Sequence, residues 1–170
     1  MDHKLLGEYN KVLLSPLSYL DIEKLRIIRN KNKRWFVYQK SISIEEQVEW
    51  YCGYLSRSDD VMFSVFHRDS QKWVGAVGLY HIDQIHKQAE FGRIVIDGAS
   101  VNEKGLGLDA TICVCNIGFE KLGLSKITLE VYNNNVSARK TYERAGFSTV
   151  SSDGKMLFME LNKDREKEEK

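Results

Sequence analysis

The chain has 170 residues, of which 42% are hydrophobic and 29% are charged, and this composition excludes disordered and fibrous proteins. The 25 Lys and Arg residues nearly balance the 24 Asp and Glu residues, so no overall basic field favours nucleic acid. Three cysteines without paired spacing indicate neither a disulfide framework nor a metal site, and they suit a reducing cytoplasm. Apolar runs are far shorter than the roughly 20 residues that span a bilayer, so we expect neither a membrane span nor an export signal.

Hydrophobic spacing and capping residues predict alternating strands and helices. Ser18 is placed to cap a first helix, and Ser43-Ile-Glu-Glu46 is a capping box that opens a second. Gly123 and Gly146 follow two further helical patterns as C-terminal stops, and Asp69-Ser-Gln71 predicts a hairpin turn. The predicted strands are 12–14, 61–66, 73–80, 90–97, 126–132 and the two arms beside Asp153-Gly154, and the predicted helices are 18–30, 44–55, 105–121 and 135–145.

A glycine turn connects the strand at 90–97 to the helix that follows it. Its sequence is Asn102-Glu-Lys-Gly105-Leu-Gly107-Leu108. The free N–H groups and the positive dipole end of such a helix start favour an anion, and glycines allow close approach of the backbone. An ordinary tight turn is the alternative. The spacing matches neither Gly-x-Gly-x-x-Gly nor Gly-x4-Gly-Lys-Ser/Thr, so neither a dinucleotide fold nor a nucleoside triphosphatase is indicated.

Two motifs resemble those of the GNAT superfamily of acetyl-CoA-dependent N-acetyltransferases. The glycine turn resembles its pyrophosphate-binding Arg/Gln-x-x-Gly-x-Gly/Ala motif. The segment from Asn135 to Phe147 resembles the more specific signature Asn-x-x-Ala/Ser-x-x-x-Tyr-x-x-x-Gly-Phe. Similarity is strongest over 60–150 and points to the branch with ribosomal-protein N-terminal, polyamine and amino-sugar acetyltransferases.

The resemblance implies a fold and a domain plan. We expect an α/β (α+β) GNAT-like mixed central sheet of about seven strands with four helices, in the order β-α-α-β-β-β-α-β-α-β-β. Residues 1–162 would form a single acetyltransferase domain, and 163–170 would be a charged C-terminal tail.

The resemblance also implies where acetyl-CoA binds. A free N–H in the splayed strand would meet the developing oxyanion, with Gly92 as a plausible bulge residue. Asn102 stands where the family has Arg or Gln, and its shorter amide would still offer hydrogen bonds to the pyrophosphate. The alternative role of Asn135 is that of a helix N-cap. The alternative for Lys140 is a side chain that only contacts solvent. The expected cofactor-binding residues are Ile94, Val95, Ile96, Asn102, Gly105, Leu106, Gly107, Leu108, Asn135, Ala138 and Lys140.

Acetyl transfer to an amine needs a base and an acid. By resemblance Tyr142 would protonate the departing thiolate, and Glu90 would serve as the base or bind the amine. His81 is the second choice, and we expect it to lie in a loop with Asp83 and His86. A basic neighbour that pairs with Glu90 is the structural alternative.

Residues 24–40 carry seven basic residues and no acidic one, with aromatic residues between them. They form either a solvated surface or a wall of a binding cleft. The resemblance favours an amino-sugar nucleotide as acceptor, bound by Arg29, Arg34, Trp35 and His81. Polyamines and protein N-termini are alternatives, and a non-catalytic acyl-CoA-binding module is the alternative of another class. We expect no metal, nucleic acid or membrane as partner, and leave a homodimer open.

Overall fold

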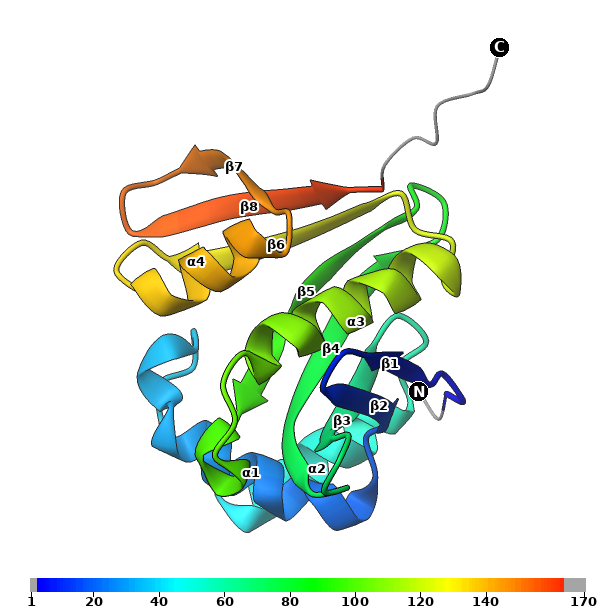
Figure 1. Ribbon diagram of the computed structural model, residues 1–170, viewed down its shortest axis with the longest axis vertical. Helices are drawn as coiled ribbons and strands as arrows, with labels where there is room; N and C mark the ends of the chain where they lie inside the picture. The colour runs from blue at the N-terminus through cyan, green and yellow to red at the C-terminus, as the bar shows by residue number, and fades with distance from the viewer. Residues whose placement is uncertain (1–2, 164–170) are drawn as a thin grey trace.

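The computed structural model describes residues 3–163, which form one eight-stranded sheet in the order β1-β2-β3-β4-β5-β6-β8-β7 (Figure 1). The strands are β1 (Gly7–Tyr9), β2 (Val12–Pro16), β3 (Val61–His67), β4 (Trp73–Asp83), β5 (Gln88–Ile96), β6 (Lys126–Tyr132), β7 (Ser148–Ser152) and β8 (Met156–Asn162). The α-helices are α1 (Ile22–Lys31), α2 (Ile44–Leu55), α3 (Leu106–Glu120) and α4 (Val136–Arg144), and the short 3₁₀ turns are η1 (Tyr19–Asp21), η2 (Lys33–Trp35) and η3 (Gly98–Val101).

This architecture confirms the expected mixed α/β fold with four helices. The additional strand is β1, a three-residue edge strand whose short, mostly exposed sequence gave no periodic signal. It turns into β2 through Asn10, whose φ of 45° is a conformation that asparagine tolerates. The expected tail at 163–170 lies outside the described residues apart from Lys163.

One local prediction is confirmed and two are wrong. The capping box of α2 forms as expected, whereas Ser18 donates to the Asp21 carboxylate at 2.9 Å and makes no side-chain cap. The first helix therefore starts with η1. Strand β4 continues to Asp83, so His81 and Asp83 are strand residues and not part of a loop.

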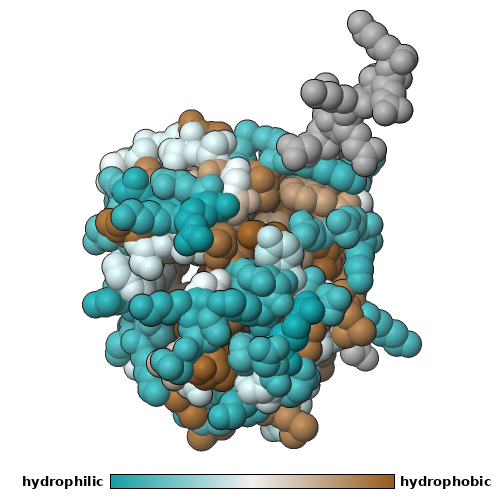
Figure 2. All heavy atoms as spheres, viewed as in Figure 1, coloured by the Kyte–Doolittle hydropathy of each residue, from teal (hydrophilic) through white to brown (hydrophobic). Residues whose placement is uncertain are grey.

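The two faces of the sheet are covered by different helices and hold two separate cores. Helices α3 and α4 cover one face, and Figure 1 shows α3 crossing in front of the central strands. Helices α1 and α2 cover the opposite face. The face of the molecule seen in Figure 2 is largely hydrophilic, because α3 directs its apolar side chains inward onto the sheet.

A β-bulge in β5 changes which side chains face which core. Arg93 and Ile94 together oppose the single residue Val77 of β4. Before the bulge, Ala89 and Phe91 belong to the core beneath α3, and after it the even-numbered isoleucines take that side. Arg93 has the positive φ, 52°, so the bulge lies one residue beyond the expected Gly92.

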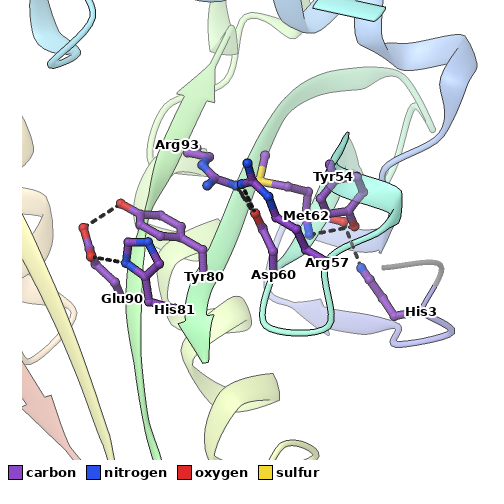
Figure 3. A network of polar contacts seen from close by, with 9 residues as sticks. All are labelled: His3, Tyr54, Arg57, Asp60, Met62, Tyr80, His81, Glu90 and Arg93. Atoms are coloured by element: carbon purple, nitrogen blue, oxygen red, sulfur yellow. Dashed lines mark hydrogen bonds and ion pairs between the residues drawn. The ribbon is translucent and has the colours of Figure 1, made fainter. Parts of the chain in front are cut away.

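An ion pair holds Arg93 on the face covered by α1 and α2 (Figure 3). Its guanidinium donates to both Asp60 carboxylate oxygens at 2.8 and 2.7 Å, and Arg57 donates to the same carboxylate at 3.2 Å. Asp60 is 1% exposed and stands directly before β3. Because a buried carboxylate needs such partners, Asp60 connects the start of β3 to the bulge of β5.

Strand β5 leaves its other neighbour after a short contact. It pairs with β6 in parallel at only Gln88, Ala89 and Glu90, and beyond them β6 continues its pairing with β8 alone. The second half of β5 is therefore held by β4 on one side and is open on the other.

Replacing Asp60 with asparagine should lower the free energy of unfolding by about 1.5–3 kcal/mol, because charged hydrogen bonds to two arginines are lost from a buried position. Urea unfolding curves measure this change. Asp59→Asn, at the neighbouring exposed carboxylate, is the control and should cost much less. Equal losses for the two variants would show that the Asp60 ion pair does not stabilise the bulge.

Candidate active site

A cavity of about 430 Å³ lies where β5 and β6 separate. It is lined by β5 from Glu90 to Ile96, by β6 from Leu129 to Tyr132, by α4 and by the segment after α1. Figure 2 shows the molecule hollowed on its left side, between the part that carries α4 and the part that carries this segment. The cavity brings together nine of the residues expected at the site: Arg29, Trp35, Glu90, Ile94, Val95, Ile96, Asn135, Ala138 and Tyr142.

Tyr142 presents a buried phenol to this cavity. The residue is 8% exposed, and its ring packs edge-on against Phe91 with centroids 5.5 Å apart. Within residues 3–163 its hydroxyl has no hydrogen-bond partner. Burial raises the pKa of Tyr142 to about 12, further above neutral pH than that of an ordinary tyrosine. The Tyr142 hydroxyl can therefore donate its proton to a group bound in the cavity.

Glu90 lies at the end of the cavity where β5 still pairs with β6. Tyr80 donates its phenolic proton to one carboxylate oxygen at 2.8 Å, and His81 Nδ1 lies 3.0 Å from the other (Figure 3). Burial, and then the hydrogen bond to Glu90, raise the pKa of Tyr80. The carboxylate is therefore oriented by two neighbours from β4 and remains an acceptor for a proton or an amine.

Gly92 provides the space that this arrangement needs. A Cβ atom at this position would lie 2.7 Å from the Tyr80 hydroxyl, so any other residue would displace the tyrosine. The Arg93 guanidinium covers the same ring at 4.2 Å from its centroid. Tyr80, Arg93 and Asp60 were not expected at the site. Their positions depend on the pairing of β4 with β5, which no local sequence pattern predicts.

The glycine turn has the geometry of an anion site, although it does not line the cavity. Gly105 is the N-cap of α3 with a φ of 86° and no side-chain cap, so the first N–H groups of the helix remain without helical partners. A Cβ atom added at Gly105 or Gly107 would meet no atom within 4 Å. Leu106 is buried at 1% exposure and acts as an anchor, while Leu108 is half-buried. Asn102 is exposed and left-handed, with a φ of 51°.

Helix α4 begins beside the cavity. The Asn135 side chain accepts a hydrogen bond from the Ala138 N–H at 3.3 Å, so the N-cap role is observed. Both residues also line the cavity. Lys140 lies on the exposed side of α4, away from the cavity lining.

The basic residues of the segment 24–40 do not all present free charges to solvent. Arg29 is 8% exposed and donates to the Lys40 and Tyr38 carbonyl oxygens, which ties the chain after α1 back onto the helix. Arg34 is exposed and stacks over Trp35 at 4.8 Å. Arg34 and His81 do not line the cavity, whereas Arg29 and Trp35 do. Part of the basic run is therefore structural.

Residues 3–163 contain no cluster of three or more His, Cys, Asp or Glu side chains arranged to hold a metal ion. None of the helices in the same range has the length and apolar character needed to cross a membrane.

Comparisons with known proteins agree with this geometry. The model of the acetyltransferase (GNAT) domain family matches residues 11–148. The uncharacterized N-acetyltransferase YoaA of Bacillus subtilis is 22% identical over 145 residues, which cover 82% of this chain and 81% of YoaA. Apo FdhC, a nucleotide-linked sugar GNAT, superposes with a TM-score of 0.83 at 22% identity, covering 94% of this chain and 91% of FdhC. Vibrio cholerae spermidine N-acetyltransferase, solved with CoA and spermine, superposes with a TM-score of 0.78 at 24% identity. The match covers 89% of this chain and 95% of that enzyme.

Arg29→Ala should loosen the segment that follows α1, because two backbone carbonyl groups lose their common donor. We expect amide hydrogen exchange in residues 36–42 to become at least about tenfold faster, with little change in the central strands. Mass spectrometry of peptic fragments measures this. Arg34→Ala removes a guanidinium that stacks only on the surface and should leave this exchange unaltered. If both variants exchange at the wild-type rate, Arg29 does not hold the segment.

Proposed function

The chain belongs to the GNAT acetyltransferase family, and on that premise we propose that it transfers the acetyl group of acetyl-CoA to a primary amine of a small molecule. The observation that carries this proposal is the opening between β5 and β6, which a buried phenol and an oriented carboxylate both face. The cavity is lined by residues of both cores, on the two faces of the sheet. A donor bound along α3 and α4 and an acceptor bound beside α1 would therefore meet within it.

Three features of the chain fit coenzyme A. The uncapped start of α3 offers N–H groups to a pyrophosphate, and the empty space above Gly105 and Gly107 leaves room for it. Ile94, Val95 and Ile96 present an unpaired strand edge to an extended pantetheine arm, with Asn135 and Ala138 opposite. Asn102 and Lys140 are exposed, and we propose that both contact the phosphates.

Each chemical requirement of acetyl transfer has a residue at the cavity. Glu90 accepts the proton of the attacking amine or positions that amine. A backbone N–H at the open edge of β5 stabilises negative charge on the carbonyl oxygen. Tyr142 donates its proton to the departing sulfur, because the phenol is protonated at neutral pH. Acetyl-CoA supplies the activated acetyl group.

For the acceptor we propose an amino-sugar nucleotide. The structural similarity to FdhC supports this class, and so does the cationic Arg29 at the cavity wall. A polyamine is the second candidate, favoured by Glu90 and the exposed Glu130 at the same cavity and by the similarity to the spermidine enzyme. Protein N-termini come third. A non-catalytic acyl-CoA-binding module would retain cofactor binding and lack turnover on every amine.

We further propose a cytoplasmic location and one acetyltransferase domain over residues 1–162. Cys52, Cys113 and Cys115 are all free thiols, which a reducing compartment preserves. We also propose that the chain forms a homodimer.

Acetyl-CoA should stabilise the folded chain by about 2.7 kcal/mol at 100 times its dissociation constant. Gly107→Glu should abolish this gain, because it places bulk and negative charge where the pyrophosphate would bind. Gly53→Glu is the matched control, since Gly53 lies in α2 with equally open space beside it and faces no cofactor. Thermal melting with and without acetyl-CoA measures both. A melting temperature of the wild type that saturating acetyl-CoA does not change would reject the proposed function.

Tyr142→Phe should lower kcat by about 10- to 10⁴-fold while CoA still stabilises the protein, because only the phenolic proton is removed. Thiol release measured with a chromogenic disulfide reports the rate. Tyr19→Phe, at an exposed tyrosine, should leave the rate unchanged. Full activity of Tyr142→Phe under conditions where chemistry limits the rate would assign the acid role to another group.

A further inference from the structure

A second cavity lies next to the first, between the sheet and helices α1 and α2. We call it the apolar chamber; it measures about 310 Å³, and its walls include Leu25, Ile42, Trp50 and Met62. A volume near the lower end for ligand pockets suits a single ring system and not a whole drug-sized molecule. The chamber is therefore sized for one part of a larger ligand.

The chamber and the active-site cavity share five wall residues. These residues form the boundary between the two cavities. The shared residues are Arg29, Phe36, Tyr38, Arg93 and Val95. A ligand that starts at Glu90 and passes this boundary enters the chamber on the face covered by α1 and α2. The glycine turn and α4 belong to the opposite face, so the chamber is separate from the part of the proposed cofactor site that binds the pyrophosphate.

One polar side chain in the chamber has no partner. Gln47 is 4% exposed and lies on the buried side of α2, in line with Tyr51 and Tyr54. Among residues 3–163 no group forms a hydrogen bond with its side-chain amide, although the residue lines the chamber. Neither amide atom is fully enclosed, so a ligand in the chamber can form hydrogen bonds with them. The Gln47 amide can donate a hydrogen bond through its NH₂ group and accept one through its carbonyl oxygen when a ligand enters the chamber.

The boundary between the two cavities carries positive charge. The partners of Arg29 are neutral carbonyl oxygens; within the described part of the chain no carboxylate forms an ion pair with it, and Glu46 acts on it only at longer range. Arg93 and Arg57 share the single charge of Asp60. The boundary thus favours an anion and disfavours a cationic chain.

From these observations we propose that the apolar chamber binds the pyrimidine base of a nucleotide-linked acceptor, with the Gln47 amide hydrogen-bonded to the edge of the base. This assignment rests on the proposed function. The imide edge of uracil or thymine offers an acceptor beside a donor, which matches a glutamine amide. Trp50 and Phe36 supply aromatic surface for the faces of the ring, and Arg29 lies where the phosphates would pass.

Calorimetric titration of the unaltered protein with three probes tests the assignment without any mutation. Uridine 5′-diphosphate should bind at least about tenfold more tightly than inorganic pyrophosphate, because the base adds its own contacts. N3-methyluridine 5′-diphosphate should lose about 5- to 10-fold, because its ring edge no longer donates. Equal affinity for uridine diphosphate and pyrophosphate would overturn the assignment.

Gln47→Leu keeps the side chain's size and removes its amide. In this variant uridine diphosphate and its N3-methyl derivative should bind equally well, while the acetyl-CoA melting shift stays at the wild-type value. Glu49→Leu adds the same leucine to the exposed side of α2 and should retain the preference for the unmethylated base. Retained discrimination in Gln47→Leu would overturn the role of Gln47.

The outcomes separate this inference from the proposed function. Acetylation of spermidine by a protein that binds no uridine diphosphate would reject the base site and leave acetyl transfer intact. Uridine diphosphate binding that depends on Gln47, in a protein with no melting shift from acetyl-CoA, would support the base site and reject the proposed function.

Discussion

The site depends on the separation of β5 from β6. The two strands pair at only three positions, and the bulge at Arg93 then holds β5 against β4 with its outer edge unpaired. Strand β6 satisfies its backbone on the other side through seven pairs with β8. An unpaired edge inside a sheet is unfavourable unless something else occupies it. The fold therefore contains a position for an extended ligand that binds by strand-like contacts, and Tyr142 and Glu90 lie at that position.

Stability and function share the charged groups around this opening. Asp60 is buried to hold Arg93, and the same guanidinium covers the ring of Tyr80, which in turn orients Glu90. Arg29 holds the segment after α1 through backbone carbonyls and still keeps a positive charge at the wall of the cavity. Each arginine thus has a structural partner while its charge continues to act on the cavity. This is why a charge count of residues 24–40 does not identify the acceptor.

The sequence was most informative where the signal is local. The capping box at Ser43, the glycine turn and the spacing from Asn135 to Tyr142 each depend on neighbouring residues, and each forms the expected element. Features set by pairing between distant segments could not be predicted. The bulge at Arg93 requires a register with β4, and the Arg29 contacts require the chain to return at Tyr38 and Lys40. The role of Gln47 could not be predicted, because the sequence does not show that a single polar residue on the buried side of a helix lacks a hydrogen-bond partner.

A crystal structure of the protein with bound coenzyme A tests the central claim most directly. The account predicts that the pantetheine arm lies along the free edge of β5 at residues 94–96, with its thiol within hydrogen-bond reach of the Tyr142 hydroxyl and its pyrophosphate on the first turn of α3. Strands β5 and β6 should remain apart beyond Glu90. Coenzyme A bound elsewhere on the molecule, or a sheet in which β5 and β6 close along their whole length, would contradict the account.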